Sequence, residues 1–335
     1  MITSRIFIFG DIHGCYDEFI ELTQQVGVTD EDILVSLGDI VDRGPKSVEL
    51  YHYFKNRRNS LVIIGNHERK HINNVLSYAQ EIVKLQFGEE YPEFIKWLNT
   101  LGYYYDTQDA LIVHAAFENS VPVEQQRQDV LAGSTSGERY LESKYPESTY
   151  WTEYYTGEKP IIYGHRVVGE NPEIINNTYG IDTGACHGGM LTAIELPGFK
   201  IHQVKAKKDY WKEEQLKWQL SILQSKDWMN MDFNSIEKQF KKLDFVETPE
   251  VVEYLNVLKT KINALKNSLH VISSTIERKT NELLNQHPEN FNMEVSKLPY
   301  KSFIYKCRAG NLNLEDLIKS LNTPYKVEQL VAQLN

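Results

Sequence analysis

Three short apolar stretches of this sequence end in similar polar loops: RIFIFGDIHG at residues 5–14, ILVSLGDIVDRG at residues 33–44 and LVIIGNHE at residues 61–68. Each begins as a buried strand and then turns at a glycine. Between them, residues 15–26 have helical apolar spacing, and residues 47–57 also read as a helix. The alternation of strand and helix predicts βαβ units and a mostly parallel sheet.

Two later apolar runs also end in polar residues. Residues 110–113 precede His114, and residues 160–163 precede His165. Loops at the carboxyl ends of the strands of an open α/β sheet converge on one crevice. We therefore expect the polar residues that follow all five runs to meet in one site.

The residues that follow these strands carry the donor atoms of a metal site without thiolates. They are Asp11, His13, Asp39, Asn66, His114 and His165. Oxygen and imidazole donors suit manganese, iron, zinc or magnesium. Two ions about 3.5–4 Å apart share a bridging carboxylate, and this arrangement suits in-line displacement at phosphorus. Each element alone is more often a turn, a solvated loop or a hydrogen-bonded histidine, so the prediction depends on their joint occurrence.

The composition is that of a soluble globular protein of one large domain or two ordinary ones, with 335 residues, 41% hydrophobic and 24% charged. Three widely spaced cysteines without a CxxC pair favour a reducing compartment and argue against a cysteine-based zinc site. No stretch approaches the roughly 18–20 apolar residues of a membrane span, and the start of the chain has no secretory pattern. We predict a cytoplasmic protein that does not enter a membrane.

The second half of the chain differs from the first in net charge and in the spacing of its apolar residues. Net charge is −13 before Lys205 and +3 from there on, so we expect a first domain at residues 1–204 and a mainly helical region at residues 205–335. Apolar residues in residues 251–276 recur in steps of four and three, which predicts a long helix with one apolar face. That face either packs on other parts of the chain or, because its period is seven residues, mediates self-association as a coiled coil.

The remaining expected elements are a further strand at residues 190–196, helices and loops in the segment 121–155, and helices near residues 208–223, 314–321 and 326–334. We expect Asn313 to cap the first of the last two helices and Pro324 to begin the second. Residues 300–308 alternate basic and aromatic side chains, which fits either an amphipathic element or a surface that faces nucleic acid or phosphate.

The polar loops carry a specific family resemblance. GDIHG, GDIVDRG and GNHE at residues 10–14, 38–44 and 65–68 resemble the three signature blocks of the calcineurin-like metallophosphoesterases, in their phosphoprotein phosphatase branch. The likeness continues at PKSVE, YGIDTG and GGMLTA, residues 45–49, 179–184 and 188–193. The last block resembles bacterial and phage members, including diadenosine tetraphosphatases, phage protein phosphatases and the phosphatase modules of polynucleotide kinase-phosphatases. The resemblance spans about residues 5–200 and implies an α/β metallophosphoesterase β-sandwich flanked by helices.

The resemblance implies ligands for two divalent ions, with manganese expected first and iron, zinc, nickel or magnesium as alternatives. Asp11 and His13 would hold the first ion, Asp39 would bridge both, and Asn66, His114 and His165 would hold the second. A hydroxide shared by the ions would attack phosphorus, because two cations lower the pKa of bound water.

The resemblance also implies residues that act on the substrate. Arg43 would clamp the phosphate through its guanidinium, and His67 would protonate the leaving oxygen while Asp42 orients it. Asp182 lies in a matching block near the site, and we include it among the candidates for substrate contact without assigning its role.

The sequence departs from the family in two places. The family usually has a second phosphate-binding arginine between the two late histidines, often just before a tryptophan, but no arginine directly precedes Trp151. Arg127 and Arg139 are the candidates, and the alternative for each is a solvated position on a helix. Cys186 and His187 stand where apolar or aromatic residues are common, so either could simply pack, or His187 could contact substrate.

These observations predict a metal-dependent enzyme that hydrolyses phosphomonoesters. A phosphoprotein is the substrate expected first, and nucleic-acid ends, cyclic phosphates or dinucleoside tetraphosphates are the alternatives. A binding scaffold that has lost activity is the rival from another class of protein. The presence of His67, Asp42 and Arg43 argues against the scaffold.

Overall fold

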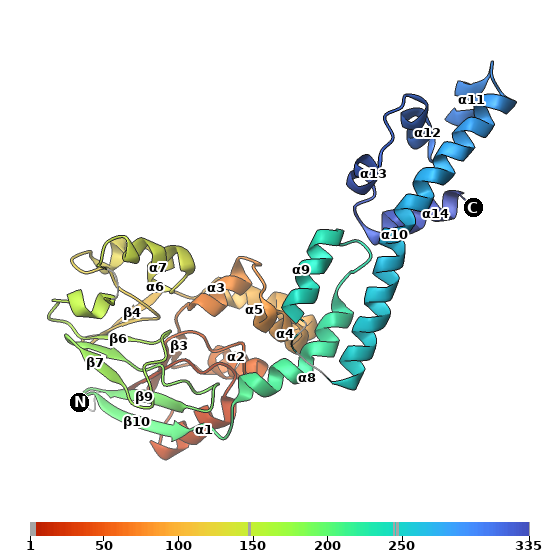
Figure 1. Ribbon diagram of the computed structural model, residues 1–335. Coiled ribbons are helices and arrows are strands. Elements are labelled where there is room, and N and C mark those ends of the chain that lie inside the picture. Colours follow the sequence, from red (N-terminus) through yellow and green to blue (C-terminus); the bar gives the residue numbers. More distant parts are fainter. Residues whose placement is uncertain (1–4, 147–148, 244, 246–247, 335) are drawn as a thin grey trace. The chain divides into compact units, whose positions relative to one another are not determined.

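The computed structural model describes residues 5–146, 149–243, 245 and 248–334. The chain divides into two compact units, residues 1–218 and 219–335, with the boundary inside helix α8 (Tyr210–Ser225) (Figure 1). The change of composition predicts a domain boundary at residue 204. That position marks the end of the last strand, whereas the first unit also includes the first turns of α8. Our expectations for residues 1–4 and 147–148 lie outside the described residues.

The first sheet of the first unit has the strand order β10-β9-β1-β2-β3. Its strands are β1 (Ile6–Phe9), β2 (Ile33–Ser36), β3 (Ser60–Val62), β9 (Met190–Leu196) and β10 (Lys200–Lys205). The strands β1, β2 and β3 are parallel, as the βαβ pattern predicts, whereas β9 is antiparallel to both of its neighbours. The parallel strands send their carboxyl ends, and the loops that follow, to one edge of the sheet.

The second sheet has the strand order β4-β5-β6-β8-β7. Its strands are β4 (Tyr104–Asp106), β5 (Leu111–Val113), β6 (Ile161–Tyr163), β7 (Glu173–Ile175) and β8 (Thr178–Gly180). Here β5, β6 and β8 are parallel, and the two edge strands are antiparallel to their neighbours. The tight turn between β7 and β8 uses Asn176 and Asn177, both at positive φ, as two-residue hairpins require.

The prediction of a mostly parallel sheet was therefore wrong in one respect, because the structure has two mixed sheets. The chain closes hairpins at the edges of both sheets, and a short connection can join only antiparallel strands. The sequence argument followed the βαβ units and did not assign β4, β7, β8 or β10. The metallophosphoesterase sandwich implied by the family resemblance is confirmed.

Alternation along the strands separates three layers of core. Ile8, Val35, Ile112 and Ile162 belong to one buried cluster to which both sheets contribute. Their neighbours Phe7, Phe9 and Leu34 belong to a second cluster, together with side chains of helices over the first sheet. Leu111, Val113, Ile161 and Tyr163 belong to a third cluster, with side chains of the segment 115–155. Because side chains alternate between the faces of a strand, both faces of each sheet are buried.

The helices of the first unit complete these outer layers. Those in the cluster on the first sheet are α1 (Tyr16–Gln25), α2 (Ser47–Asn56), α4 (Tyr78–Phe87) and α5 (Tyr91–Leu98). Those in the cluster on the second sheet are α6 (Gln128–Leu131), α7 (Thr135–Glu142) and the short helix η3 (Trp151–Tyr154). The helix α3 (Asn66–Ile72) and the short helices η1 (Gly88–Glu90) and η2 (Val123–Gln125) lie in the connections.

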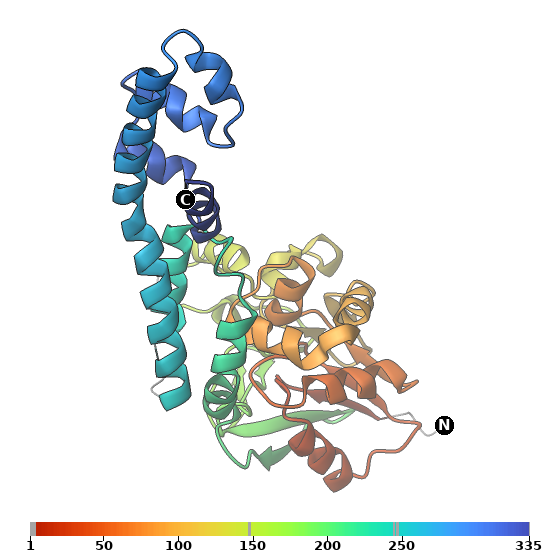
Figure 2. The same cartoon turned by 90° about the vertical axis from the view of Figure 1, so that its right-hand side faces the viewer.

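The second unit is helical and is built on one long helix (Figure 2). Its helices are α9 (Phe233–Leu243), α10 (Pro249–Gln286), α11 (Phe291–Ser296), α12 (Lys301–Arg308), α13 (Leu314–Ser320) and α14 (Pro324–Leu334). Helix α10 packs against α11, α12, α13 and α14, and it buries most of the predicted apolar stripe. The apolar face is therefore covered within the chain itself, and self-association through α10 stays a prediction.

Two local predictions for this unit are confirmed. The Asn313 side chain caps α13 by accepting a hydrogen bond from the Asp316 backbone at 2.9 Å, and Pro324 begins α14. Residues 301–308 form a helix, which fits the amphipathic alternative for that segment. Within the described residues, no helix combines the length and apolar character needed to cross a membrane.

Candidate metal centre

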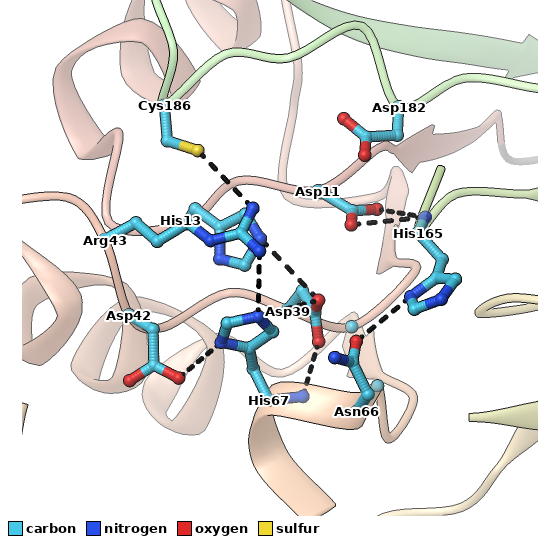
Figure 3. Close-up of polar contacts among 12 residues, drawn as sticks. Asp11, His13, Asp39, Asp42, Arg43, Asn66, His67, His165, Asp182 and Cys186 are labelled. Atoms are coloured by element: carbon cyan, nitrogen blue, oxygen red, sulfur yellow. Dashed lines mark hydrogen bonds and ion pairs between the residues drawn. The ribbon is translucent and has the colours of Figure 1, made fainter. Parts of the chain in front are cut away.

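The predicted ligands follow the parallel strands of both sheets. Asp11 and His13 follow β1, Asp39 follows β2, Asn66 follows β3, His114 follows β5 and His165 follows β6. Figure 3 shows the hydrogen bonds that hold these side chains: the backbone N–H of His165 donates to Asp11, the His165 ring contacts Asn66, and the backbone N–H of His67 donates to Asp39. The single crevice expected from one sheet is thus assembled from the loops of two sheets.

These loops hold their side chains in an unusual backbone conformation. His13, Asp39, Asp42, Arg43 and His165 all have positive φ, between 46° and 71°. Residues other than glycine rarely adopt this conformation, which costs on the order of 1–3 kcal/mol each. Backbone strain concentrated in five neighbouring polar residues is typical of a functional site.

Two groups of three donor atoms lie within 4.8 Å of one another: His13, Asp39 and His67, and Asp39, His114 and His165. Asp39 belongs to both. Its Oδ2 atom lies 3.6 Å from Nε2 of His13 and 3.6 Å from Nε2 of His114. One carboxylate oxygen between two imidazole nitrogens is the arrangement that a bridging ligand requires.

Hydrogen bonds to the main chain fix the orientation of two imidazoles. Nδ1 of His13 donates to the carbonyl of Val41, and Nδ1 of His114 donates to the carbonyl of Leu37, each at 2.8 Å. Because a carbonyl can only accept, the proton lies on Nδ1 and the Nε2 lone pair faces the centre. Such outer hydrogen bonds are the usual means of orienting metal-binding histidines.

The Asn66 and His165 side chains complete the second group. Oδ1 of Asn66 lies 3.2 Å from Nε2 of His114 and 3.1 Å from Nδ1 of His165. The other ring nitrogen of His165 lies 3.1 Å from Oε1 of Glu138. His165 therefore presents the opposite ring nitrogen from that of the other two histidines, a detail that the sequence did not reveal.

Asp11 is buried beside these groups but lies in neither set of three. Its carboxylate accepts hydrogen bonds from the backbone N–H of His165 at 3.1 and 3.2 Å. Burial and the nearby carboxylates of Asp182 and Asp39 raise the pKa of Asp11 well above its usual range. This mutual repulsion of buried acids is what bound cations would relieve.

Burial lowers the pKa of two of the histidines and acts against the ionisation of Asp39. It lowers the pKa of His13 well below its usual range and that of His114 to about 4, so both are neutral near pH 7. Neutral imidazole is the form that binds metals. Burial also acts against ionisation of Asp39, but the surrounding imidazoles, His114 foremost, hold the pKa of this carboxyl well below its ordinary value.

Two glycines make room for the carboxylates. A Cβ atom at Gly65 would lie 2.2 Å from Oδ1 of Asp39, and one at Gly164 would lie 2.1 Å from Oδ1 of Asp11. Any larger residue would displace an acid of the site. The donor set, its convergence and this cradle fit two divalent cations, with Asp39 shared between them.

A second polar group lies next to the donors. Nδ1 of His67 lies 2.6 Å from Oδ2 of Asp42, and Nε2 of His67 accepts from the Arg43 guanidinium at 3.2 Å (Figure 3). The backbone N–H of His67 also donates to Oδ1 of Asp39 at 3.0 Å. The predicted acid, its orienting carboxylate and the phosphate clamp are thus brought together beside the bridging ligand.

Asp42 is held by more partners than we predicted. Its Oδ1 atom lies 3.0 Å from Nε2 of His71, and Gln80 donates to its Oδ2 atom. Burial acts to raise the pKa of Asp42, but His71 and His67 keep it well below its ordinary value, so the group is a carboxylate. Tyr91 in turn bonds to His71 at 2.9 Å.

Glu68 joins two of the loops. Its carboxylate accepts from the backbone N–H groups of Asp39, Ile40 and Gly65 at 2.8–3.0 Å. Burial and the Asp39 charge raise the pKa of Glu68 to about 8, while these donors oppose the shift. The sequence placed Glu68 in the GNHE block but did not reveal this support. This role could have been predicted from the sequence, because Glu68 lies three residues after Gly65, the residue at the N-cap of α3, where a glutamate can accept hydrogen bonds from the backbone.

The remaining candidates for substrate contact differ in burial: the two arginines are exposed and Asp182 is buried. Arg127 is exposed, pairs with Asp129 at 2.9 Å and lies over the Tyr140 ring, so its guanidinium is already engaged; Arg139 is exposed on α7. Asp182 is buried near Asp11, and burial raises its pKa to about 6.

Cys186 and His187, which stand where the family commonly has apolar or aromatic residues, differ in their exposure. The Cys186 thiol is buried 3.9 Å from the Arg43 guanidinium, while His187 is exposed. Cys186 therefore packs beside Arg43.

Comparison with known proteins agrees with this geometry. The family model of the calcineurin-like phosphoesterases matches residues 4–227. The bis(5′-nucleosyl)-tetraphosphatase PrpE [asymmetrical] of Bacillus mycoides (strain KBAB4) is 31% identical over 227 residues, which cover 57% of this chain and 89% of the relative. The protein of that name from Bacillus cereus (strain B4264) is 29% identical with the same coverage. The crystal structure of a provisionally assigned diadenosine tetraphosphatase has a TM-score of 0.51 and 22% identity, covering 61% of this chain and 95% of that one.

The matched residues include every donor of the candidate centre. They also make up more than half of the sequence. The chain belongs to the calcineurin-like phosphoesterase family and is a metal-dependent phosphoesterase.

Proposed function

We propose that this protein hydrolyses dinucleoside tetraphosphates with two divalent metal ions, manganese first among them. The observation that carries the chemistry is the position of Asp39 Oδ2, 3.6 Å from an imidazole nitrogen on each side. The substrate class is supported by the names of the similar proteins, of which this chain covers 89%. The phosphoprotein substrate that we expected first becomes the second candidate, and the test below includes it.

We assign the first ion to His13, Asp11 and Asp39, and the second to Asp39, Asn66, His114 and His165. When bound, two such ions polarise the phosphoryl group and supply an activated water. The side chains act as fixed ligands: burial keeps His13 and His114 neutral, and hydrogen bonds to main-chain carbonyls aim both rings.

Arg43 and His67 act on the substrate. Arg43 now donates to Nε2 of His67, so a phosphate that binds the guanidinium would take over this donor and free the imidazole nitrogen. The freed Nε2 would then take up a proton from solvent, and the resulting imidazolium would pass this proton to the leaving oxygen. Asp42, a carboxylate 2.6 Å from Nδ1, stabilises the charged imidazole and holds its orientation.

One rate comparison tests the proposal. Purified protein with manganese is assayed on diadenosine tetraphosphate, a phosphoserine peptide and a 3′-phosphorylated oligonucleotide, with Asp39→Asn as the control for contaminating hydrolases. We expect kcat/KM to be at least about tenfold higher on the dinucleoside tetraphosphate, a difference of about 1.4 kcal/mol. A higher kcat/KM on the phosphoserine peptide would show that the substrate is a phosphoprotein, and the proposed metal chemistry would still hold. Absence of turnover with several divalent ions would favour the scaffold.

The same assay identifies the second phosphate contact. We keep Arg127 and Arg139 as candidates, and the structure adds Arg166, which follows His165 and lies over the Tyr150 ring. Each is replaced by alanine. The variant that raises KM most, without lowering metal content, marks the residue that binds phosphate.

A further inference from the structure

A cavity of about 320 Å³ lies beside the metal-ligand candidate His165. Its walls come from the loops after β5 and β6, from α7 and from the start of η3. Its lining includes the apolar residues Ala116 and Leu141 and the aromatic residues Tyr145, Tyr150 and Trp151. Small-molecule sites occupy about 300–1,000 Å³, so this cavity suits one small ligand and is too small for a folded peptide.

The cavity is separated from the metal donors by one imidazole ring. Nδ1 of His165 lies 3.1 Å from Asn66, on the metal side, and Nε2 lies 3.1 Å from Glu138. His165 and Glu138 both line the cavity. A group bound there would therefore lie next to a phosphate held at the metal centre.

The lining matches the chemistry of a nucleoside. Aromatic side chains stack on bases whatever the base sequence. Tyr150 and Arg166 both line the cavity, and the Arg166 guanidinium lies 4.2 Å from the centre of the Tyr150 ring. The carboxylate of Glu142, exposed at the cavity, can accept hydrogen bonds from ribose hydroxyls, as acidic residues do in dinucleotide sites.

A second, polar cavity of about 420 Å³ shares Gly133, Glu138 and His165 with the first. It is lined by Asn66, by the basic side chains of Arg69 and Lys70, and by Ser134, Thr135 and Ser136. Cationic and hydroxyl groups suit a chain of phosphates. An apolar, aromatic cavity and a basic one on a common histidine match the two parts of a nucleoside polyphosphate.

We propose that the aromatic cavity lined by Ala116, Leu141, Tyr145, Tyr150 and Trp151 binds a nucleoside of the substrate and so selects nucleotides over other phosphate esters. This inference rests on the proposed function, because it assigns a binding site to the substrate class named there. It adds that recognition comes from residues 115–146 and 149–151, which lie between the two late histidines in the sequence.

The test compares two non-hydrolysable inhibitors that share one anionic group. Adenosine 5′-(α,β-methylene)diphosphate carries a nucleoside, and methylenediphosphonate does not. Their inhibition constants are measured against para-nitrophenyl phosphate hydrolysis with manganese. We expect the nucleoside to improve binding at least about tenfold, at the lower end of the 1–3 kcal/mol that stacking of one base contributes. Equal constants would overturn the proposal.

Filling the cavity should remove this advantage. Ala116→Leu adds three carbon atoms at a position that is 7% exposed and lines the cavity, so we expect the ratio of the two constants to fall at least fivefold. Ala332→Leu, exposed on α14, is the matched control and should keep the wild-type ratio. A folded Ala116→Leu protein with an unchanged ratio would contradict the site.

A second variant decides the question if Ala116→Leu does not fold. Glu142→Ala removes an exposed carboxylate and should lower the same ratio about threefold, and an unchanged ratio in this variant would overturn the site. If the protein did not hydrolyse diadenosine tetraphosphate but kept the tenfold preference for the nucleoside inhibitor, the proposed function would fail while the cavity stood. If no metal supported turnover, the two constants would be measured by calorimetry with the same expected ratio.

Discussion

Both units of this protein have an apolar core, but the first unit buries acidic side chains as well. The first unit buries Asp11, Asp39, Asp42 and Glu68, all at most 3% exposed, among polar loops with strained backbone. The second unit buries a regular apolar stripe on α10, with Ile262, Leu269, Ile272 and Ile276 at most 4% exposed. Burying charge in strained loops lowers stability, whereas burying an apolar stripe contributes to it. The comparison teaches that the buried acids of the first unit cannot be explained by packing, whereas the apolar stripe of α10 can.

The largest expected effect comes from Asp39, the carboxylate that we propose as the bridge. Asp39→Asn keeps the side-chain shape but removes the charge that both cation sites share, so kcat/KM should fall by on the order of 10³, and metal content should fall with it. Metal content is measured by inductively coupled plasma mass spectrometry and turnover on diadenosine tetraphosphate. Asp17→Asn removes an exposed carboxylate paired with Lys46 and serves as the control. A variant that kept both metal and rate would show that Asp39 is not the bridge.

His67→Ala tests the proton donor next to the bridge. Loss of a general acid typically costs 10²–10⁴-fold, and only a poor leaving group needs the proton. We expect a loss on the order of 10²-fold or more for an alkyl phosphate and a clearly smaller one for para-nitrophenyl phosphate, in parallel kcat/KM measurements. Equal losses on the two substrates would assign His67 another role.

Glu138→Gln should have a moderate effect on metal binding. The carboxylate lies 3.1 Å from Nε2 of His165, and removal of such outer partners typically weakens metal binding about 10–100-fold. Titration of the metal-free protein with manganese gives the affinity directly. Glu124→Gln, which removes an exposed charge on η2, should leave the affinity as it is. If both variants bound manganese equally well, Glu138 would not orient the ligand.

Metal removal should lower the thermal stability of the first unit and leave that of the helical unit unchanged. Without cations the acids of the first unit are buried and repel one another; burial first, and then the nearby carboxylates of Asp182 and Asp39, raise the pKa of Asp11 well above its usual range. Manganese at a hundred times its dissociation constant should stabilise this unit by about 2.7 kcal/mol, and it should leave the helical unit unchanged. Differential scanning calorimetry with and without a chelator measures both. Equal shifts of all transitions would contradict the contrast between the units.

The smallest effect on catalysis is expected from the apolar stripe. Ile276→Ala leaves a cavity at a fully buried position of α10 and should destabilise the helical unit by about 2–5 kcal/mol. It should change kcat/KM less than twofold, because the Ile276 side chain contributes only to the packing of the helical unit. Val271→Ala, at a position 66% exposed on the same helix, is the control for stability. Denaturant unfolding followed by circular dichroism, together with the rate assay, would expose a catalytic role of the stripe.

The sequence by itself determined the elements whose signals are local. A run of apolar residues, a glycine and then a polar residue predicted five strand ends and all six candidate ligands, because strand, turn and donor lie within a few positions of one another. The steps of four and three predicted α10, and Asn313 and Pro324 predicted the starts of two helices. Periodicity, turns and caps are properties of neighbouring residues, so they can be recognised without the fold.

Only the tertiary structure decided what depends on distant residues. It divided the strands between two mixed sheets, placed His71 and Gln80 on Asp42, and turned the Nδ1 atom of His165 toward Asn66 through contacts that span up to 99 positions. No local pattern encodes such pairs, because the chain can bring many other residues to the same place. The physical reason is that packing and hydrogen bonding act through space, whereas periodicity acts along the chain.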